Sequence, residues 1–461
     1  MWYYIDITSY LICPFYILLF YFFAKRFARK HYSHDPFFSK KFIQGFWVKI
    51  AAAIAYALFI QYYYGGGDSF RYFGYSNVMR DAISKDPSNL RFLFSSGEEF
   101  YNYCQSLSEI NEFNPANNIL TSDANLMTVR LSCFLSFFSF KKFLIVSLFF
   151  SMLSYIGIWK MYMLFSAIYS EYKKQIAFSF LFLPSFCFWG SGILKETVSL
   201  MALGILITQC HKFFFQRKFS IRVLVLIFAT CYLIYIVKSY ILASFILAFA
   251  CWLIAVRFKK IKSTFVRLTV ILFLVAIAAI SSTFITFDAQ AQEEEVLKNV
   301  EFFSNTYRAS AEEGSAAAYT NVQIDPSVSG IIKGIPEVIM TIFFRPYIWE
   351  AKSMILFISM IESCFFLILT LMVLFKGKIF GFLGFIFKNP VMIFCLVISL
   401  VLGLIVGFTT FNFGTIIRYK IPCMPFFCMM LLIANRYYNN KKKEKADTKA
   451  NAVIINPASA V

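Results

Sequence analysis

Long apolar stretches alternate with short polar segments along this chain of 461 residues. About eleven of these stretches approach the ~20 residues with which an α-helix crosses a bilayer. They lie near residues 8–24, 44–63, 143–165, 176–190, 193–210, 222–237, 239–256, 268–286, 354–375, 391–411 and 416–434. The pattern predicts an all-α fold, a polytopic transmembrane helical bundle. We expect one integral-membrane domain over residues 1–440 and a disordered cytoplasmic tail over residues 441–461.

Basic clusters between the stretches set the predicted orientation. They lie at residues 25–41, 173–174, 212–222, 257–267, 376–388 and 436–449. Lys and Arg concentrate in cytoplasmic loops, and placing every cluster there alternates correctly with the predicted helices. In a bacterium this predicts a multi-pass inner-membrane protein with a periplasmic amino terminus and a cytoplasmic carboxyl terminus. Two long loops, about 64–142 and 287–352, then face the periplasm.

Composition narrows the classes of function. The chain is 59% hydrophobic and 15% charged, with a formal net charge of +19. Most Lys and Arg lie in short loops between apolar stretches, as expected of topology determinants beside anionic lipid. No basic stripe with interleaved aromatic residues occurs outside them, so we exclude nucleic-acid binding and expect contact with membrane lipid. The 11 cysteines lie mostly inside apolar stretches, which predicts packing rather than disulfide bonds.

Four polar motifs stand beside apolar stretches, and the predicted topology places all four on the outer face. They are Gly65-Gly66-Gly67-Asp68-Ser69, Ser191-Gly192-Ile193-Leu194-Lys195-Glu196, Arg345-Pro346-Tyr347-Ile348-Trp349-Glu350 and Arg418-Tyr419-Lys420. Charges held at a membrane surface are unfavourable unless they have a partner or a function. A set of charges on one face therefore predicts a functional site.

The first two motifs each combine glycine with charge. Three glycines before Asp68 allow a sharp bend and close approach of a ligand. Asp68 could accept a proton from a sugar hydroxyl, with Arg71 close by, or it could simply cap a helix. Lys195 begins an apolar stretch, where a cation opposes the helix dipole. This predicts an anionic partner for Lys195, which is Glu196, another acid or a ligand phosphate.

The third motif carries groups suited to a sugar phosphate. Arg345 can bind a phosphate through two parallel hydrogen bonds, and Trp349 can stack on a sugar ring. Both residue types are also common anchors at the membrane interface. Glu350 supplies a candidate catalytic carboxylate. Glu362 lies deeper in the next apolar stretch, where a carboxylate indicates a function or a buried partner.

The fourth motif places Arg418 and Lys420 on an outer turn, against the usual distribution of basic residues. Charge balance with the acidic outer loop is the alternative explanation. The three histidines, His31, His34 and His211, all map to the cytoplasmic side. We therefore expect an outer site without a catalytic histidine or a histidine metal centre, and we expect no metal and no cofactor.

The segments GGGDSFRYF, PSFCFWGSGILKE, FRPYIWEAKSMILFISMIES and FGTIIRYKIPCMPF resemble polytopic polysaccharide polymerases of the Wzy and EpsG type from Bacteroidetes-like bacteria. The resemblance runs from about Gly65 to Phe427. It implies the joining of oligosaccharide repeat units carried on undecaprenyl diphosphate, for O-antigen, capsule or exopolysaccharide, alongside a flippase and a chain-length regulator. It also implies that outward arginines bind the anionic carrier, and Arg345 and Arg418 match, with Lys420 and Lys195 in support.

The residues suit that chemistry. Diphosphate leaves from the anomeric carbon of the donor chain, and two or three cations can offset the developing charge. Asp68 or Glu350 would deprotonate the acceptor hydroxyl, which makes the expected enzyme a metal-independent polymerase of the glycosyltransferase type.

Two alternatives stay open. A GT-C-type glycosyltransferase would add one sugar from a polyprenyl phosphate donor, although its carboxylate usually follows the first span rather than the second. A transporter or flippase for lipid-linked sugars would show charges or broken helices near the midplane of the bilayer, and structural repeats. An O-antigen ligase is disfavoured because no histidine maps to the outer face.

Overall fold

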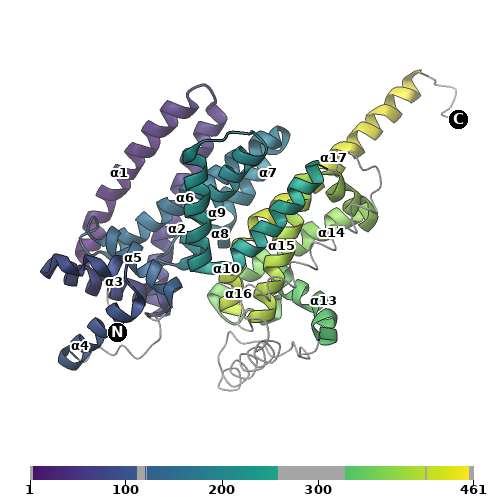
Figure 1. Ribbon diagram of the computed structural model, residues 1–461. Coiled ribbons are helices and arrows are strands. Elements are labelled where there is room, and N and C mark those ends of the chain that lie inside the picture. The colour runs from purple at the N-terminus through teal and green to yellow at the C-terminus, as the bar shows by residue number, and fades with distance from the viewer. Residues whose placement is uncertain (1–3, 112–119, 121, 258–327, 411–412, 456–461) are drawn as a thin grey trace. The chain divides into compact units, whose positions relative to one another are not determined.

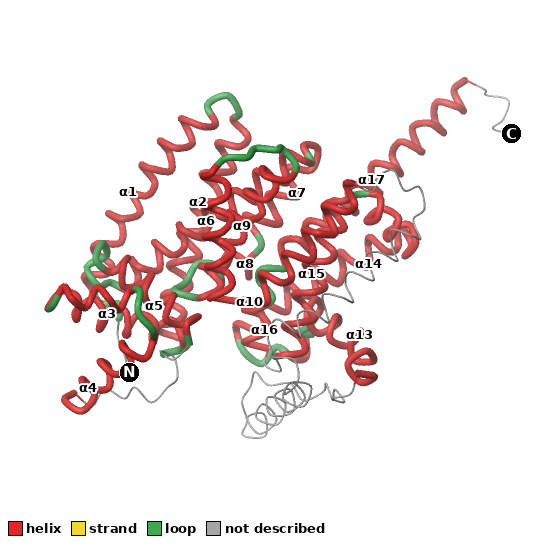
Figure 2. The backbone as a smooth tube through the Cα atoms, viewed as in Figure 1, coloured by secondary structure: helices red, strands yellow, loops and turns green. Residues whose placement is uncertain are grey.

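The chain folds into α-helices joined by turns (Figures 1 and 2). The structure, a computed structural model, describes residues 4–111, 120, 122–257, 328–410 and 413–455. No strand occurs among these residues, which confirms the all-α class. Contacts between residues divide the chain into two compact units, residues 1–242 and residues 243–461.

Seven of the described helices are long and apolar enough to cross a membrane. They are α1 (Ile7–Tyr32), α2 with its π-helical end η1 (Pro36–Tyr64), α6 (Phe143–Ile168), α9 (Lys195–Phe214), α10 (Ile221–Arg257), α14 (Met354–Lys388) and α15 (Pro390–Thr409). An eighth is present if α16 (Phe413–Tyr419) and the first part of α17 (Met424–Ile455), bent by 70°, form one span. These helices support the prediction that the chain is an integral-membrane protein. The predicted span at 268–286 lies outside the described residues.

Breaks occur within or between three of the predicted stretches. The stretch at 176–190 is not among the seven, because it is divided into α7 (Lys173–Ala177), π-helical η4 (Phe178–Phe182) and α8 (Pro184–Trp189). Pro184 has no backbone N–H to continue the helical ladder. The stretches at 222–237 and 239–256 are two helical parts of α10 that meet at a kink, where Lys238 has non-helical angles (φ −158°, ψ 82°). The 37 residues of α10 would extend about 55 Å if straight, longer than a bilayer core.

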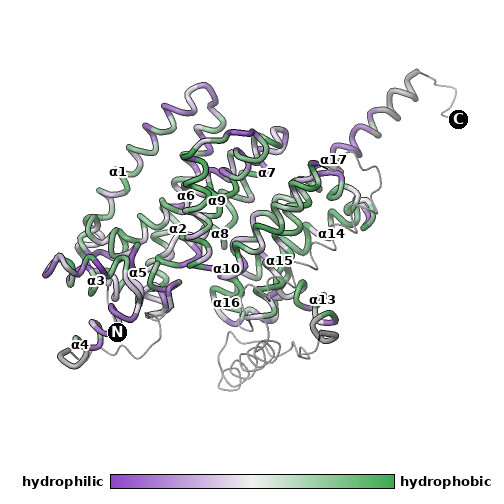
Figure 3. The backbone as a smooth tube through the Cα atoms, viewed as in Figure 1, coloured by the Kyte–Doolittle hydropathy of each residue, from purple (hydrophilic) through white to green (hydrophobic). Residues whose placement is uncertain are grey.

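The helix α6 lies at the centre of the first unit, where it packs against α2 and α9. A Cβ atom on Gly204 of α9 would lie 2.1 Å from the carbonyl oxygen of Gly157 in α6. The two backbones therefore touch, as small residues allow in membrane helix pairs. Figure 3 shows that both helices are largely hydrophobic.

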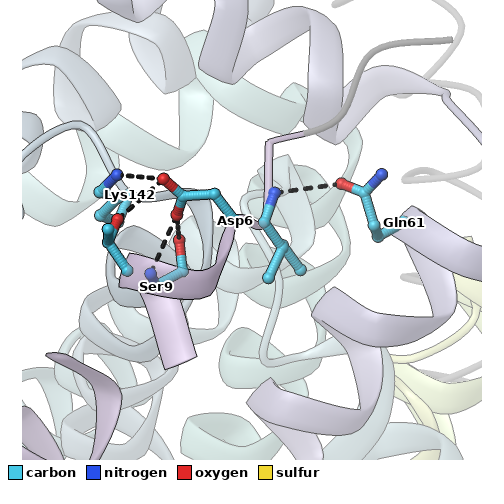
Figure 4. A network of polar contacts seen from close by, with 6 residues as sticks. Asp6, Ser9, Gln61 and Lys142 are labelled. Carbon is cyan, nitrogen blue, oxygen red and sulfur yellow. Dashed lines mark hydrogen bonds and ion pairs between the residues drawn. The ribbon is translucent and has the colours of Figure 1, made fainter. Parts of the chain in front are cut away.

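The start of α1, the end of η1 and the start of α6 meet at one end of the first unit (Figure 4). Asp6 caps α1 by accepting a hydrogen bond from the Ser9 N–H (2.9 Å), and Lys142 before α6 donates to it (2.6 Å). Gln61 of η1 accepts a hydrogen bond from the Ile5 N–H (3.3 Å). We refer to this end as the Asp6 end. Burial alone would raise the pKa of the Asp6 carboxyl, but its hydrogen bonds, led by that from Lys142, hold the pKa well below its usual range.

The region predicted as the first periplasmic loop contains four further elements. They are α3 (Asp68–Lys85), the 3-10 helix η2 (Pro87–Leu93), α4 (Gly97–Asn111) and α5 (Asp123–Ser136). The helices α3 and α5 pack together. The Arg130 guanidinium of α5 donates hydrogen bonds to the carbonyls of Phe92 (3.0 Å) and Ser95, which fixes η2 and the turn after it onto α5.

The second unit contains the end of α10, then α13 (Val328–Phe344), the 3-10 helix η6 (Ile348–Glu350), α14, α15, α16 and α17. The helix α13 lies within the second predicted loop, whose earlier part, up to residue 327, lies outside the described residues. It packs on α15, where a Cβ atom on Gly407 would lie 2.4 Å from a Val338 methyl group. The helix α17 continues to Ile455, across residues that the sequence predicts to be a disordered tail.

Candidate functional site

The first two motifs meet in the first unit. The Ser69 hydroxyl, at the start of α3, donates a hydrogen bond to the carbonyl of Ile193 (3.0 Å). The Tyr56 hydroxyl of α2 lies 2.7 Å from the same Ser69 oxygen. All three residues are buried. The glycine-rich motif and the Ser191–Glu196 motif, far apart in sequence, are therefore joined directly.

Glycine is required at this junction on both sides. A Cβ atom on Gly192 would lie 2.0 Å from a carbon of the Tyr56 ring, so only glycine fits against that ring. Gly65 and Gly67 adopt φ of 68° and 94°, the left-handed region that other residues rarely occupy. The sharp bend predicted before Asp68 is present, and Asp68 is the first residue of α3.

Lys49 is a buried cation near the middle of the α2–η1 helix. Its side chain binds the end of the divided element made of α7, η4 and α8. Lys49 is 2% exposed, and its ammonium donates to the Gly190 carbonyl (2.5 Å), which also accepts from the Ser154 hydroxyl of α6 (2.7 Å). Gly190 follows the last turn of α8. Helix carbonyls that end inside a membrane have no water to satisfy them, so Lys49 and Ser154 act as a cap.

The segment between α8 and α9 runs along α2. Gly190 lies against Lys49, Gly192 lies against Tyr56, and Ile193 binds Ser69. The segment therefore climbs from the middle of α2 toward the Asp6 end, and α9 begins near the start of α3. Both candidate residues that open these helices, Asp68 and Lys195, are half-buried. Arg71, one turn further along α3, is exposed.

The acid beside Lys195 has a cationic partner from another helix. The Glu196 carboxylate lies 2.7 Å from the ammonium of Lys238, the non-helical residue of α10, and side-chain exposures are 1% and 4%. The sequence predicts Glu196 as one option for the partner of Lys195. The structure pairs Glu196 with Lys238, a cation that the sequence pattern alone did not single out, and the partner of Lys195 stays a prediction.

In the second unit, Arg345 follows α13 and holds Glu350. Its Nε lies 3.0 Å and 3.1 Å from the two carboxylate oxygens, and its Nη2 also contacts Glu350. The Glu350 carboxylate accepts a further hydrogen bond from the Tyr347 N–H (2.8 Å), which closes η6. Glu350, predicted as a catalytic base, is thus the counter-ion of Arg345 in this structure.

The third and fourth motifs also meet. The Lys420 ammonium, in the turn between α16 and α17, donates to the carbonyl of Ile342 in α13 (2.7 Å). The Arg345 guanidinium lies 5.2 Å from the ring centre of Phe413 in α16. Glu362 of α14 lies near enough to interact electrostatically with Lys420. Arg345, Lys420 and Glu362 are all buried, with exposures of 7%, 4% and 8%.

The remaining candidates of the second unit lie nearer its surface. The Arg418 guanidinium lies 5.1 Å from the centre of the neighbouring Tyr419 ring, and Arg418 is half-buried. Trp349 is 76% exposed, with its ring centre 5.0 Å from that of Tyr347. Trp349 is therefore accessible to a ligand or to lipid.

Comparison with protein-family models, curated proteins and solved structures found no match to this chain. Membership of the polysaccharide polymerases therefore stays a prediction, which rests on the sequence motifs alone.

The structure thus joins the four motifs in two pairs, one pair in each unit. That both pairs share one face of a membrane stays a prediction. Among the described residues, no group of three or more His, Cys, Asp or Glu side chains is placed to hold a metal ion. Sequence reasoning missed Lys49, Tyr56 and Lys238. The sequence could have indicated Lys49 and Lys238, because Lys49 lies within a predicted apolar stretch and Lys238 lies between two of them.

Proposed function

We propose that the protein polymerises oligosaccharide repeat units carried on undecaprenyl diphosphate, at the periplasmic face of the bacterial inner membrane. The observation that carries this proposal is the meeting of the third and fourth motifs. Lys420 binds the Ile342 carbonyl, one turn before Arg345, so two buried cations from distant segments gather at the end of α13. Such a cluster of cations is suited to bind a diphosphate, because a diphosphate is an anion.

The geometry of Arg345 supports phosphate as the ligand class. Its guanidinium already contacts both oxygens of a carboxylate, that of Glu350. Two oxygens of a phosphate group can take the same arrangement. The guanidinium is nearly buried, where interactions between charges are stronger than in water.

In the proposed reaction, an acceptor hydroxyl attacks the anomeric carbon of the donor chain. The bond from that carbon to the diphosphate oxygen breaks, and the electron pair leaves with undecaprenyl diphosphate. Arg345, Arg418 and Lys420 would stabilise the developing negative charge. Glu350 would accept the hydroxyl proton after it releases Arg345, and Asp68 stays the alternative acceptor that the sequence predicts.

The test is the length of polymer made in cells that lack the chromosomal copy. Arg345→Ala and Arg418→Ala should each abolish elongation while the protein still inserts in the membrane at normal abundance. Lys333→Ala is the matched control, because Lys333 is an exposed cation of α13 and its loss removes the same charge. Polymer of normal length from either arginine variant would contradict the proposal.

One observation favours a second candidate, a transporter or flippase for lipid-linked sugars. Lys49 places a buried cation near the middle of a predicted span, beside the broken element made by α7, η4 and α8. Broken helices and buried charges at such a depth are typical of transporters. Purified protein in vesicles separates the two functions. Given lipid-linked repeat units, a polymerase makes a ladder of product lengths, whereas a flippase only moves the units from one leaflet of the vesicle membrane to the other.

A further inference from the structure

Four phenylalanines are exposed at the end of α5 and in the turn that follows it. We refer to them as the Phe patch, and their exposures are 54% for Phe134, 41% for Phe137, 56% for Phe138 and 67% for Phe140. The rings of Phe134 and Phe138 lie edge to face, 5.4 Å apart. Apolar side chains gathered on one surface indicate a partner, because their contact with water is unfavourable.

The contact between the Phe patch and α1 shows which partner fits. The Tyr16 hydroxyl of α1 donates a hydrogen bond to the carbonyl of Phe138 (2.5 Å). At ~1.5 Å per residue, Tyr16 lies about 13 Å along α1 from its first residue. The neighbouring α1 residues Leu11, Phe15 and Leu18 are 72%, 64% and 65% exposed, as in a helix that faces lipid. The hydrogen bond from Tyr16 to Phe138 therefore places the Phe patch beside this helix.

Charged groups next to the Phe patch indicate which side of it faces water. Lys141 and Lys142 directly follow the Phe patch, and they pair with Asp81 of α3 and with Asp6 at the start of α1. The Arg80 guanidinium of α3 lies 5.2 Å from the ring centre of Phe137. Basic side chains above a layer of aromatic rings are the usual arrangement of a segment that lies in a membrane interface.

We infer that the Phe patch is a lipid-binding surface, inserted among the acyl chains of the leaflet at the Asp6 end. The region between α2 and α6 is then anchored to the bilayer through α5. Because α3 packs on α5, this anchor also holds Asp68, the first residue of α3, at the level of the membrane interface. The inference does not depend on the polymerase proposal.

The test compares cysteine variants labelled with an environment-sensitive fluorophore in phosphatidylcholine vesicles. Phe134→Cys and Phe138→Cys probe the Phe patch. Leu18→Cys on α1 is the control for lipid, and Ser84→Cys, an exposed residue of α3, is the control for water. The unmodified chain, labelled in parallel, gives the background, because its cysteines are buried apart from the half-buried Cys231 and Cys364.

Labels at positions 134 and 138 should behave like the label at 18. Their emission should shift to shorter wavelength, lose intensity when lipids carry a nitroxide on the acyl chain, and resist aqueous iodide. The label at 84 should show the reverse. Quenching by iodide at 134 and 138 would overturn the inference. Protection from both quenchers would also overturn it, because a protein surface would then cover the Phe patch.

Discussion

The Lys238 ammonium and the Glu196 carboxylate form an ion pair of 2.7 Å that is almost wholly buried. It joins the one non-helical residue of α10 to the first turn of α9, at the last residue of the Ser191–Glu196 motif. The pair therefore fixes the break in α10 to the segment that contacts α2. A buried pair of this kind stabilises its surroundings only while both charges are present.

Removing one charge of this pair should be more damaging than removing both. Lys238→Met leaves Glu196 buried without this cation, and we expect a loss of about 3–5 kcal/mol in the free energy of unfolding. The double variant Glu196→Gln with Lys238→Met should recover part of the loss. Thermal unfolding of the purified variants in detergent measures both effects. Equal stability of Lys238→Met and the unmodified protein would contradict the buried ion pair between Lys238 and Glu196.

The close approach of Gly192 to Tyr56 predicts a steric effect. Gly192→Ala places a methyl group into the Tyr56 ring, so the segment or the ring must move, and we expect destabilisation of about 1–3 kcal/mol. Gly66→Ala is the matched control, because a Cβ atom there meets no neighbour within 4 Å. Thermal unfolding should separate the two variants, and similar midpoints would count against the described packing.

The lowered pKa of Asp6 predicts a stability difference that depends on pH. The folded-state pKa lies below the unfolded value near 3.9, so the carboxylate stabilises the fold above about pH 4, and this contribution is lost as the pH falls through the lower folded-state pKa. Asp6→Asn should lower the midpoint of thermal unfolding near pH 7. The difference from the unmodified protein should shrink at acidic pH. A difference that stays constant with pH would show that charge is not the cause.

Glu350 and a phosphate would compete for Arg345. Glu350→Gln should therefore tighten the binding of pyrophosphate, by about tenfold if the competing carboxylate contributes ~1.4 kcal/mol. Glu337→Gln is the matched control, because Glu337 is an exposed acid of α13 and its loss changes the net charge equally. Isothermal titration of both variants measures the effect. Unchanged or weaker binding by Glu350→Gln would show that Glu350 does not occupy the anion site.

Much of the fold follows from hydrophobic pattern, and much of the site does not. Apolar length predicts α1, α6 and α15, because a span must bury its whole backbone in its own hydrogen bonds. The short stretches around Ser191 also allow a broken or re-entrant element there, but they do not show that the break lies at Pro184 and the π-helical turn before Gly190. The hydrophobic pattern also assigns α13 to a loop, since its 17 residues contain Pro336 and follow a polar region.

The charged motifs were visible in the sequence, but their partners were not. An arginine and a glutamate five positions apart, Arg345 and Glu350, could be paired on spacing. The contacts of Lys420 with Ile342 and of Ser69 with Ile193 join segments far apart in the chain. Such contacts depend on how helices pack, which a single sequence does not specify.

The most direct test of the account asks whether the two motif pairs share one side of the membrane. Asp68→Cys represents the first pair and Arg418→Cys the second, and Lys218→Cys, an exposed residue between α9 and α10, is the control that the sequence predicts to be cytoplasmic. A membrane-impermeant thiol reagent added to intact spheroplasts should label positions 68 and 418 and should reach position 218 only after lysis. Labelling of 68 and 418 from opposite sides would contradict the predicted topology, in which both motif pairs face the same aqueous compartment.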